Sequence, residues 1–242
     1  MTRPFSIKRL QFYMTMPTPC PYLPGRHERK IFTQLDSLSG PHLNNFLTHS
    51  GFRRSQNVLY RPACENCQAC QSLRVCASKF EATQSMRRII RRNQNLNAAV
   101  CPAIATQEQF SLMQKYLVNR HPDGGMTQMD YYRYKTMVEE CASQTEIMEY
   151  RLDDGELVAC VLMDRLSDGL SLVYSFFHPD ITRQSPGKFM ILEHITRCKT
   201  EKLNYLYLGY WVPDSPKMAY KALFKPCEVL GPTGWRRLES RQ

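Results

Sequence analysis

Three cysteines at CxxCxxC spacing are the first residues of this chain whose pattern indicates chemistry. Cys64, Cys67 and Cys70 follow an Arg-Pro pair, which favours a loop. Such spacing lets neighbouring thiolates bind one ion, as in tetrahedral zinc or iron–sulfur sites. A closed site needs a fourth ligand, and we expect Cys20 in that place, with Cys76 as the second candidate. Reduced thiols that bind no metal are the alternative.

A run of arginines is the second candidate for chemistry. On a helix, spacings of i, i+1, i+4 and i+5 place four of them in one basic stripe, with two isoleucines on the other side. A solvated helix face explains such a run as well, but the stripe is also a good surface for phosphates. The residues are Arg87, Arg88, Arg91 and Arg92.

The composition is that of a soluble protein with an anionic partner. The 242 residues have a formal net charge of +10, which favours nucleic acid through counterion release, although a merely soluble basic protein looks the same. No apolar run approaches the ~20 residues of a membrane span, and residues 1–12 lack the apolar core of a signal peptide. We expect a cytoplasmic protein with mostly reduced thiols and no membrane partner.

One stretch predicts the element around which the rest is arranged. Apolar runs at 170–177 and 205–211 have the length of buried strands, and residues 189–198 repeat apolar side chains at helical spacing. A strand, a helix and a second strand in so short a segment make a βαβ unit, whose strands are parallel with a right-handed crossover. Ligands usually bind at the carboxyl ends of such strands.

The length allows one large domain or two small ones. We place a boundary at about residue 105, so that residues 1–105 form a smaller α+β domain with the cysteines and the basic stripe, and residues 106–242 form the second domain. In the second domain the patterns predict a set of elements in chain order: helices at 107–120 and 130–141, a hairpin of strands 146–151 and 156–165, a helix at 215–224 and a strand at 226–230. Phe110, Met113, Leu117 and Val118 would form the apolar face of the first helix.

This order of elements resembles that of N-acetyltransferase-type (GNAT-like) acyltransferases, so we expect an α+β fold with a mixed sheet. Acetyl-CoA enzymes usually bind the pyrophosphate with a Gln/Arg-x-x-Gly-x-Gly/Ala loop at a helix start. The corresponding loop here, residues 183–188, has one glycine and a proline, which removes an amide donor. It argues against CoA and for another acyl donor.

Taken together, the loop, the thiols and the flanking segments resemble the tRNA–protein transferases of the N-degron pathway. The nearest resemblance is to their bacterial leucine-transferring branch. The matching segments span nearly the whole chain in the same order: residues 20–23, 60–70, 87–93, 120–121, 124–126, 174–179, 209–211 and 218–221. His178 departs from the acidic residue expected in eukaryotic relatives, so no catalytic role is placed on it.

The resemblance implies transfer of leucine from leucyl-tRNA to the N-terminal amine of proteins that begin with Asp or Glu, which marks them for degradation. Arginine is the alternative amino acid. Two other functions stay open. A metal-dependent RNA-binding module would explain the thiols and the arginine stripe, and a CoA-dependent N-acetyltransferase would explain the element order.

Transfer from an aminoacyl-tRNA ester sets modest chemical demands, because the ester is already activated and holding it beside the amine supplies much of the rate. We expect Tyr174 and Tyr210 to be the catalytic residues that move the proton. Phe176 would form a wall of an apolar leucine pocket with Phe177 and Tyr210, and Tyr220 would also contact substrate. The alternative for these aromatic residues is simple core packing.

The acidic acceptor needs a cation, preferably an arginine that binds both carboxylate oxygens. Arg88, Arg120 and Lys217 are the candidates, because each lies in a segment of the resemblance. The cysteine site would be structural or regulatory, since ester aminolysis requires no metal.

Overall fold

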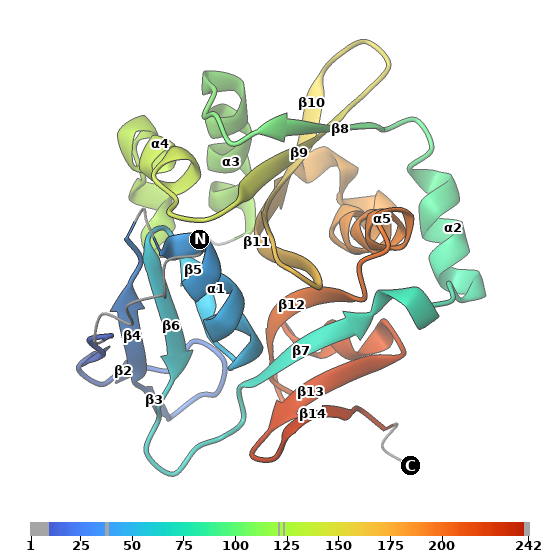
Figure 1. Cartoon of the computed structure of the whole chain (residues 1–242). Helices are drawn as coiled ribbons and strands as arrows, with labels where there is room; N and C mark the ends of the chain where they lie inside the picture. Colours follow the sequence, from blue (N-terminus) through green and yellow to red (C-terminus); the bar gives the residue numbers. More distant parts are fainter. Residues whose placement is uncertain (1–9, 37–38, 121, 123, 240–242) are drawn as a thin grey trace, which may run out of the picture.

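The centre of the molecule is an eight-stranded mixed sheet (Figure 1). The computed structural model describes residues 10–36, 39–120, 122 and 124–239. The strand order across this sheet is β14-β13-β7-β12-β11-β10-β9-β8. The strands are β7 Gln71–Cys76, β8 Asn97–Pro102, β9 Thr145–Arg151, β10 Leu157–Arg165, β11 Gly169–Phe177, β12 Tyr205–Trp211, β13 Cys227–Gly231 and β14 Gly234–Arg237. Among these described strands, only β11 and β12 are parallel neighbours.

Helices cover both faces of this sheet (Figure 1). Helices α3 (Gln107–Arg120) and α4 (Tyr131–Glu139) pack on one face, and α5 (Pro186–Thr200) and α2 (Gln84–Arg92) pack on the other. Strand β10 shows why, because its apolar side chains alternate between the faces. Val161 and Met163 join the core under α5, whereas Cys160 and Leu162 join the core under α3. Short 3₁₀ helices connect elements at Ala77–Lys79, Gly125–Gln128, Pro179–Gln184 and Ala219–Leu223.

A smaller sheet precedes the large one in the chain. Its order is β1-β4-β6-β5, with strands β1 Tyr13–Met14, β4 Lys30–Gln34, β6 Val58–Pro62 and β5 Arg53–Ser55. Helix α1 (Gly40–His49) packs on it around Leu35, Leu47, Phe52 and Leu59. A separate pair, β2 (Thr18–Pro19) and β3 (His27–Glu28), lies in the segment that contains Cys20.

A buried ion pair joins the two sheets. Arg54 of β5 donates from Nε and Nη2 to the two carboxylate oxygens of Asp164 on β10, at 2.5 and 2.7 Å. Both residues are almost wholly buried. Asn44 of α1 and Thr145 of β9 also donate to the same carboxylate. The carboxylate is therefore fully used in holding the small sheet against the large one.

The main sequence predictions are confirmed. The βαβ unit is present as β11, α5 and β12, and the two strands are parallel. The order α3, α4, β9, β10, β11, α5, β12 is the expected GNAT-like order, and the fold class is α+β. Strands β7 and β8 lie before residue 105 yet belong to the large sheet. The sheet thus takes strands from both sides of the proposed boundary, and the division into 1–105 and 106–242 stays a prediction.

Two local predictions are wrong. Val118 is 66% exposed, because it lies at the edge of the face that α3 packs against the sheet. Residues 215–224 form no α-helix, only the 3₁₀ helix Ala219–Leu223. There the buried amine of Lys221 donates to two carbonyls of β12, and such tertiary anchoring outweighs helix propensity. Residues 234–237, for which the sequence predicts no element, form β14. No helix in the described part of the chain is long and apolar enough to cross a membrane.

Candidate functional site

The parallel strands β11 and β12 stay paired over only three residues each. Their register runs from Gly169 opposite Tyr205 to Ser171 opposite Tyr207. Beyond this point the two strands no longer pair, and basic side chains donate hydrogen bonds to their backbone carbonyls. Arg53 Nη2 donates to the carbonyls of Leu172 and Val173 of β11 at 3.1 and 3.3 Å. The split between the strands is the place where a βαβ unit is expected to bind its ligand.

A second basic residue binds the other strand. Lys221 Nζ donates to the carbonyls of Leu208 and Tyr210 of β12, both at 2.8 Å. Lys221 is buried, and burial together with the nearby Arg53 charge lowers the pKa of its amine well below the ordinary value. Lys221 therefore anchors β12 through two hydrogen bonds to its carbonyls.

Gly209 of β12 makes room for Arg53. Its φ is +70°, and a Cβ there would overlap the guanidinium carbon of Arg53. A side chain at this position would therefore force the guanidinium out of the split. The same guanidinium lies 5.9 Å from the ring centre of Tyr210, a cation–π distance. The glycine in the middle of the strand is thus explained by the close approach of an arginine.

Tyrosines and a second arginine surround this split. Burial raises the pKa of Tyr220, while the charges of Arg53 and of Arg120 both lower it. Burial likewise raises the pKa of Tyr116, which is also close to Arg120 and Tyr220. Tyr174 lies next to Tyr116, and burial raises its pKa well above the ordinary value. The structure therefore brings together three of the expected residues: Tyr174, Arg120 and Tyr220.

The other expected aromatic residues are in the interior. Phe176 is 2% exposed in the core under α3, where its ring packs against Tyr134 and Tyr174. Tyr210 is 3% exposed, and its hydroxyl donates to the carbonyls of Gly51 and Tyr60 at 3.1 and 2.9 Å. Burial raises the pKa of Tyr210 far above its ordinary value. These contacts tie β12 to the small sheet, and the catalytic role of Tyr210 stays a prediction.

The cation candidates for the acceptor do not converge. Arg120 ends α3 on one face of the sheet, whereas Arg88 lies on α2, which packs with α5 on the other face. Lys217 is exposed and precedes the 3₁₀ helix that contains Tyr220. Of the three, only Arg120 is placed beside the split, through its effect on Tyr220.

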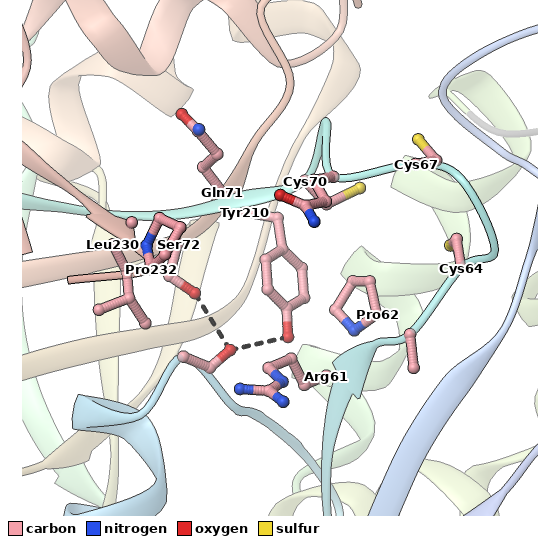
Figure 2. A pocket seen from close by; sticks show the side chains of 14 residues that line it. Arg61, Pro62, Cys64, Cys67, Cys70, Gln71, Ser72, Tyr210, Leu230 and Pro232 are labelled. Carbon is pink, nitrogen blue, oxygen red and sulfur yellow. Dashed lines mark hydrogen bonds between the residues drawn. The ribbon is translucent and has the colours of Figure 1, made fainter. Parts of the chain in front are cut away.

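The three cysteines of the CxxCxxC segment line a cavity of about 360 Å³ between the sheets (Figure 2). Figure 2 shows them along the loop from β6 to β7, and Ser72 and Tyr210 donating to one carbonyl, that of Gly51. Burial first, and then the neighbouring thiols of Cys20, Cys64 and Cys67, raise the pKa of Cys70 to about 12. The four expected thiols are therefore neighbours.

Cys67 differs from Cys70 in its surroundings. A backbone amide hydrogen bond at Ala69, and then the Arg26 guanidinium 3.3 Å away, lower the pKa of the Cys67 thiol. Among the described residues, however, no three His, Cys, Asp or Glu side chains are arranged so that they could hold one metal ion. The donor chemistry suits zinc or an iron–sulfur cluster, but this arrangement does not, and metal binding stays a prediction.

The basic stripe forms as expected. All four arginines lie on α2 and all are exposed: Arg87, Arg88, Arg91 and Arg92. No acidic side chain in the described part of the chain pairs with them; Arg87 donates to the carbonyl of Ala82. Thr83 caps the helix by accepting from the amide of Met86, and Met86 packs the helix onto the core. The helix thus presents its arginines to solvent.

Sequence reasoning missed Arg53, Lys221 and Tyr116. Arg53 and Lys221 reach the split from a different sheet and from a 3₁₀ helix, so neither residue was given a role, although Lys221 ends the matching segment 218–221. One signal was present, because a glycine inside an apolar strand often marks the close approach of another group.

Comparisons with known proteins identify the family of this chain. Residues 18–88 match the family model described as "Arginine-tRNA-protein transferase, N terminus", and residues 108–231 match "Arginine-tRNA-protein transferase, C terminus". A protein of Caulobacter vibrioides (strain NA1000 / CB15N) named "Aspartate/glutamate leucyltransferase" is 53% identical over 247 residues, 100% of this chain and 88% of its own length. A protein of Maricaulis maris (strain MCS10) with the same name is 51% identical, over 98% of this chain and 93% of its own.

Solved structures are more distant. "The structure of L-PGS from Bacillus licheniformis" superposes with a TM-score of 0.47 at 12% identity, over 58% of this chain and 45% of that one. "Tandem GNAT protein from the clavulanic acid biosynthesis pathway (without AcCoA)" gives a TM-score of 0.42 at 12% identity, over 88% and 59%. The sequence matches, by contrast, cover almost the whole chain. The chain therefore belongs to the arginine-tRNA-protein transferase family, and proteins named aspartate/glutamate leucyltransferase are similar to it over nearly all of its residues.

Proposed function

We propose that this protein is an aminoacyltransferase that moves leucine from leucyl-tRNA to the N-terminal amine of proteins beginning with Asp or Glu. The observation that supports this most is its identity of about half, over the whole chain, to relatives with that name. The arrangement of Arg53, Tyr220 and Arg120 at the strand split adds support, since arginines suit an acidic acceptor. Such an enzyme would act in the cytoplasm, where charged tRNA is the donor.

The reaction is aminolysis of an ester. The acceptor nitrogen attacks the leucyl carbonyl carbon, the C–N bond forms, the bond to the ribose oxygen breaks, and the amine proton ends on that oxygen. An α-amine has a pKa of about 7.7–8.0, so a sizeable fraction is neutral at cytoplasmic pH and a strong base is not needed. The main task of the site is to hold the two substrates together.

Tyr174 is our candidate for the proton relay. No protein group in the described residues accepts from or donates to its hydroxyl, and burial keeps its pKa high, so the group stays protonated. A protonated hydroxyl can donate to the leaving ribose oxygen while it accepts the amine proton. Tyr210 has its hydroxyl engaged by two carbonyls and is the weaker candidate.

The arginine stripe of α2 is our proposed contact for tRNA phosphates. Its side chains are exposed and unpaired by acids in the described chain. Phosphate contacts position a nucleic acid without reading its sequence. The choice of leucyl-tRNA would therefore be made elsewhere, by the pocket for the amino acid, of which Phe176 remains a candidate wall.

The proposal also covers the four clustered cysteines and the identity of the acyl donor. Although the structure does not arrange them around one ion, Cys20, Cys64, Cys67 and Cys70 have the donor chemistry to hold zinc or an iron–sulfur cluster in a structural or regulatory role, which elemental analysis of the purified protein tests. The donor would be aminoacyl-tRNA and not CoA, because Pro186 begins α5 and leaves one amide fewer at that helix start.

One label-transfer experiment separates the candidate functions. The protein is incubated with leucyl-tRNA, arginyl-tRNA or acetyl-CoA, each labelled in the acyl group, and with peptides that begin with Asp, Glu or Ala. We expect label on the Asp and Glu peptides from leucyl-tRNA alone. Transfer from arginyl-tRNA would change the amino acid, and transfer from acetyl-CoA would replace the proposal. No transfer with intact tRNA binding would indicate a binding module.

A further inference from the structure

The guanidinium of Arg53 is a half-buried charge without an acidic partner in the described chain. It uses only Nη2 for protein contacts, to the carbonyls of Leu172 and Val173. Nε and Nη1 have no hydrogen-bond partner among the described residues. Partly buried arginines are usually paired with carboxylates, because removing a charge from water costs free energy. The unused donors of Arg53 are therefore available for an anion from outside the chain.

The residues around Arg53 leave it as the main charge of the split. Lys221 lies close by, but its burial favours the neutral amine. Tyr210 and Tyr220 contribute rings and not carboxylates. Glu28 and Arg53 both affect the pKa of Tyr22, and the Glu28 carboxylate is bound to Lys30 at 2.7 Å. The split thus has positive charge, aromatic walls and no free carboxylate in the described chain.

The position of the guanidinium is built into the backbone. Gly209 has no Cβ and a positive φ, so the guanidinium lies flat against β12. The carbonyls of β11 fix the opposite side. A charge held on two sides by backbone does not need to reorganise when a ligand arrives, which lowers the cost of binding. Arg120, which is exposed and close to Tyr220, adds a second cation at the mouth.

We propose that Arg53 binds the side-chain carboxylate of the acceptor's N-terminal Asp or Glu and so determines the preference for acidic acceptors. This inference rests on the proposed function and names the residue behind its specificity. An arginine presents planar donors that fit a carboxylate, and an amide in the same place cannot replace that charge pairing. Asn and Gln acceptors have nearly the same shape but lack this charge pairing, so they are discriminated against.

The test compares Arg53→Gln and Arg53→Lys with the wild type on four peptides that differ only in their first residue: Asp, Asn, Glu or Gln. Leucyl-tRNA is the donor, and kcat/KM for each peptide and KM for leucyl-tRNA are measured. We expect Arg53→Gln to lower the Asp-over-Asn ratio of kcat/KM by about 100-fold, through loss on Asp and Glu with little change on Asn and Gln. KM for leucyl-tRNA should stay the same.

Two control variants separate charge from packing. Lys221→Met removes donors to the carbonyls of the same split and leaves the Arg53 guanidinium in place, so it should slow all four peptides in proportion. Arg133→Gln removes an exposed arginine of α4 and should change nothing. Arg53→Lys keeps a charge and a donor for the strand carbonyls, so it should fold and keep part of the preference for Asp over Asn acceptors. The melting temperature of each variant checks its folding.

The outcomes are distinguishable. If Arg53→Gln or Arg53→Lys is folded and keeps the wild-type Asp-over-Asn ratio, Arg53 does not bind the acceptor carboxylate. A loss in equal proportion on all four peptides, as expected for Lys221→Met, would also overturn the inference and leave Arg53 as a packing residue. If the wild-type protein transfers leucine to no acidic peptide, the proposed function itself fails. Transfer by the wild type together with an unchanged ratio in the variants leaves that function standing.

Discussion

Arg53 and Arg54 are neighbours on β5 and have opposite surroundings. Arg54 points to the joint between the sheets, where both oxygens of Asp164 bind it and both residues are almost wholly buried. Arg53 points to the split between β11 and β12 and is half-buried, and within the described chain its hydrogen bonds go to carbonyl oxygens and to no carboxylate. Arg54 is thus paired with a carboxylate inside the protein, whereas Arg53 keeps hydrogen-bond donors that the described chain does not use.

The difference teaches which cations are structural. A buried arginine is tolerated when a carboxylate with further hydrogen bonds neutralises it, and Asn44 and Thr145 complete such a shell around Asp164. Arg53 is held by dipoles and not by a charge, so its field is not cancelled inside the protein. The partner, more than the degree of burial, separates an arginine that stabilises the fold from one that is free to bind a ligand.

The largest expected effect comes from breaking the buried ion pair between Arg54 and Asp164. Asp164→Asn leaves the Arg54 guanidinium buried without a counter-charge, which should lower the free energy of unfolding by about 3–5 kcal/mol. Urea denaturation at pH 7 measures this. Asp153→Asn, an exposed carboxylate hydrogen-bonded to Asn97, is the matched control and should change little.

A double variant tests the reason for that loss. Arg54→Met with Asp164→Leu removes both charges, and it should recover much of the stability that Asp164→Asn removes, because no unpaired charge remains. If Asp164→Asn costs less than about 1 kcal/mol, comparable with an exposed pair, the contrast between the two arginines is wrong.

The next largest effect tests whether Gly209 sets the position of the Arg53 guanidinium. Gly209→Ala puts a Cβ against the Arg53 guanidinium at a residue whose φ is +70°. We expect a loss of about 1–3 kcal/mol in stability from the backbone conformation, together with a loss of the Asp-over-Asn preference. Thermal unfolding and the peptide assay measure the two effects.

Gly155→Ala is the matched control for this glycine. Its φ is +91°, but no heavy atom lies within 4 Å of the added Cβ. It should show the backbone cost and keep the acceptor preference. If Gly209→Ala and Gly155→Ala behave alike in both assays, the position of Arg53 does not depend on the glycine.

The contrast also explains how much the sequence could predict. The βαβ unit and helix α3 follow from apolar periodicity, which reports local packing, and the structure confirms them. Periodicity in β12 marks Tyr210 as buried but cannot say that its hydroxyl meets carbonyls of the small sheet. Arg53 and Arg54 look identical in sequence, because their partners lie on strands far along the chain. Side-chain partners across sheets are set by tertiary structure, and they decide the site.

The arginine stripe of α2 gives a third type of cation, fully exposed, with a smaller expected effect. Replacing Arg87, Arg88, Arg91 and Arg92 by Ala should raise KM for leucyl-tRNA and flatten its salt dependence, by a slope of up to about 0.9 for each phosphate that the variant no longer binds. KM for leucyl-tRNA is measured between about 50 and 200 mM salt. Arg53→Gln should leave the slope unchanged, since its ligand is the acceptor. An unaltered slope in the stripe variant would make α2 an ordinary solvated surface.

The smallest effect concerns a half-exposed pair that also joins the small and large sheets. His49 at the end of α1 has Nε2 2.9 Å from Asp168 Oδ2 and Nδ1 2.6 Å from the carbonyl of Asn45. Two acceptors favour a doubly protonated ring, and the hydrogen bond to Asp168 is the main cause that raises the pKa of His49 above 6.5. Asp168 lies also near Arg74 and Tyr207, and its own pKa is lowered from 3.8 although burial opposes the shift.

The pH dependence of this pair follows from the two directions. A raised histidine pKa gives stability that is complete below 6.5 and is lost as pH rises through the folded-state value. The lowered Asp168 pKa gives stability that is present above 3.8 and is lost as pH falls through its folded-state value. His49→Gln should therefore lower the melting temperature more at pH 6 than at pH 8.5, with a loss in stability of at most about 1 kcal/mol, as for other partly exposed pairs. An equal loss at both pH values would mean that the ring is neutral in the folded protein and that only the hydrogen bond, and not the charge, holds α1 against the large sheet.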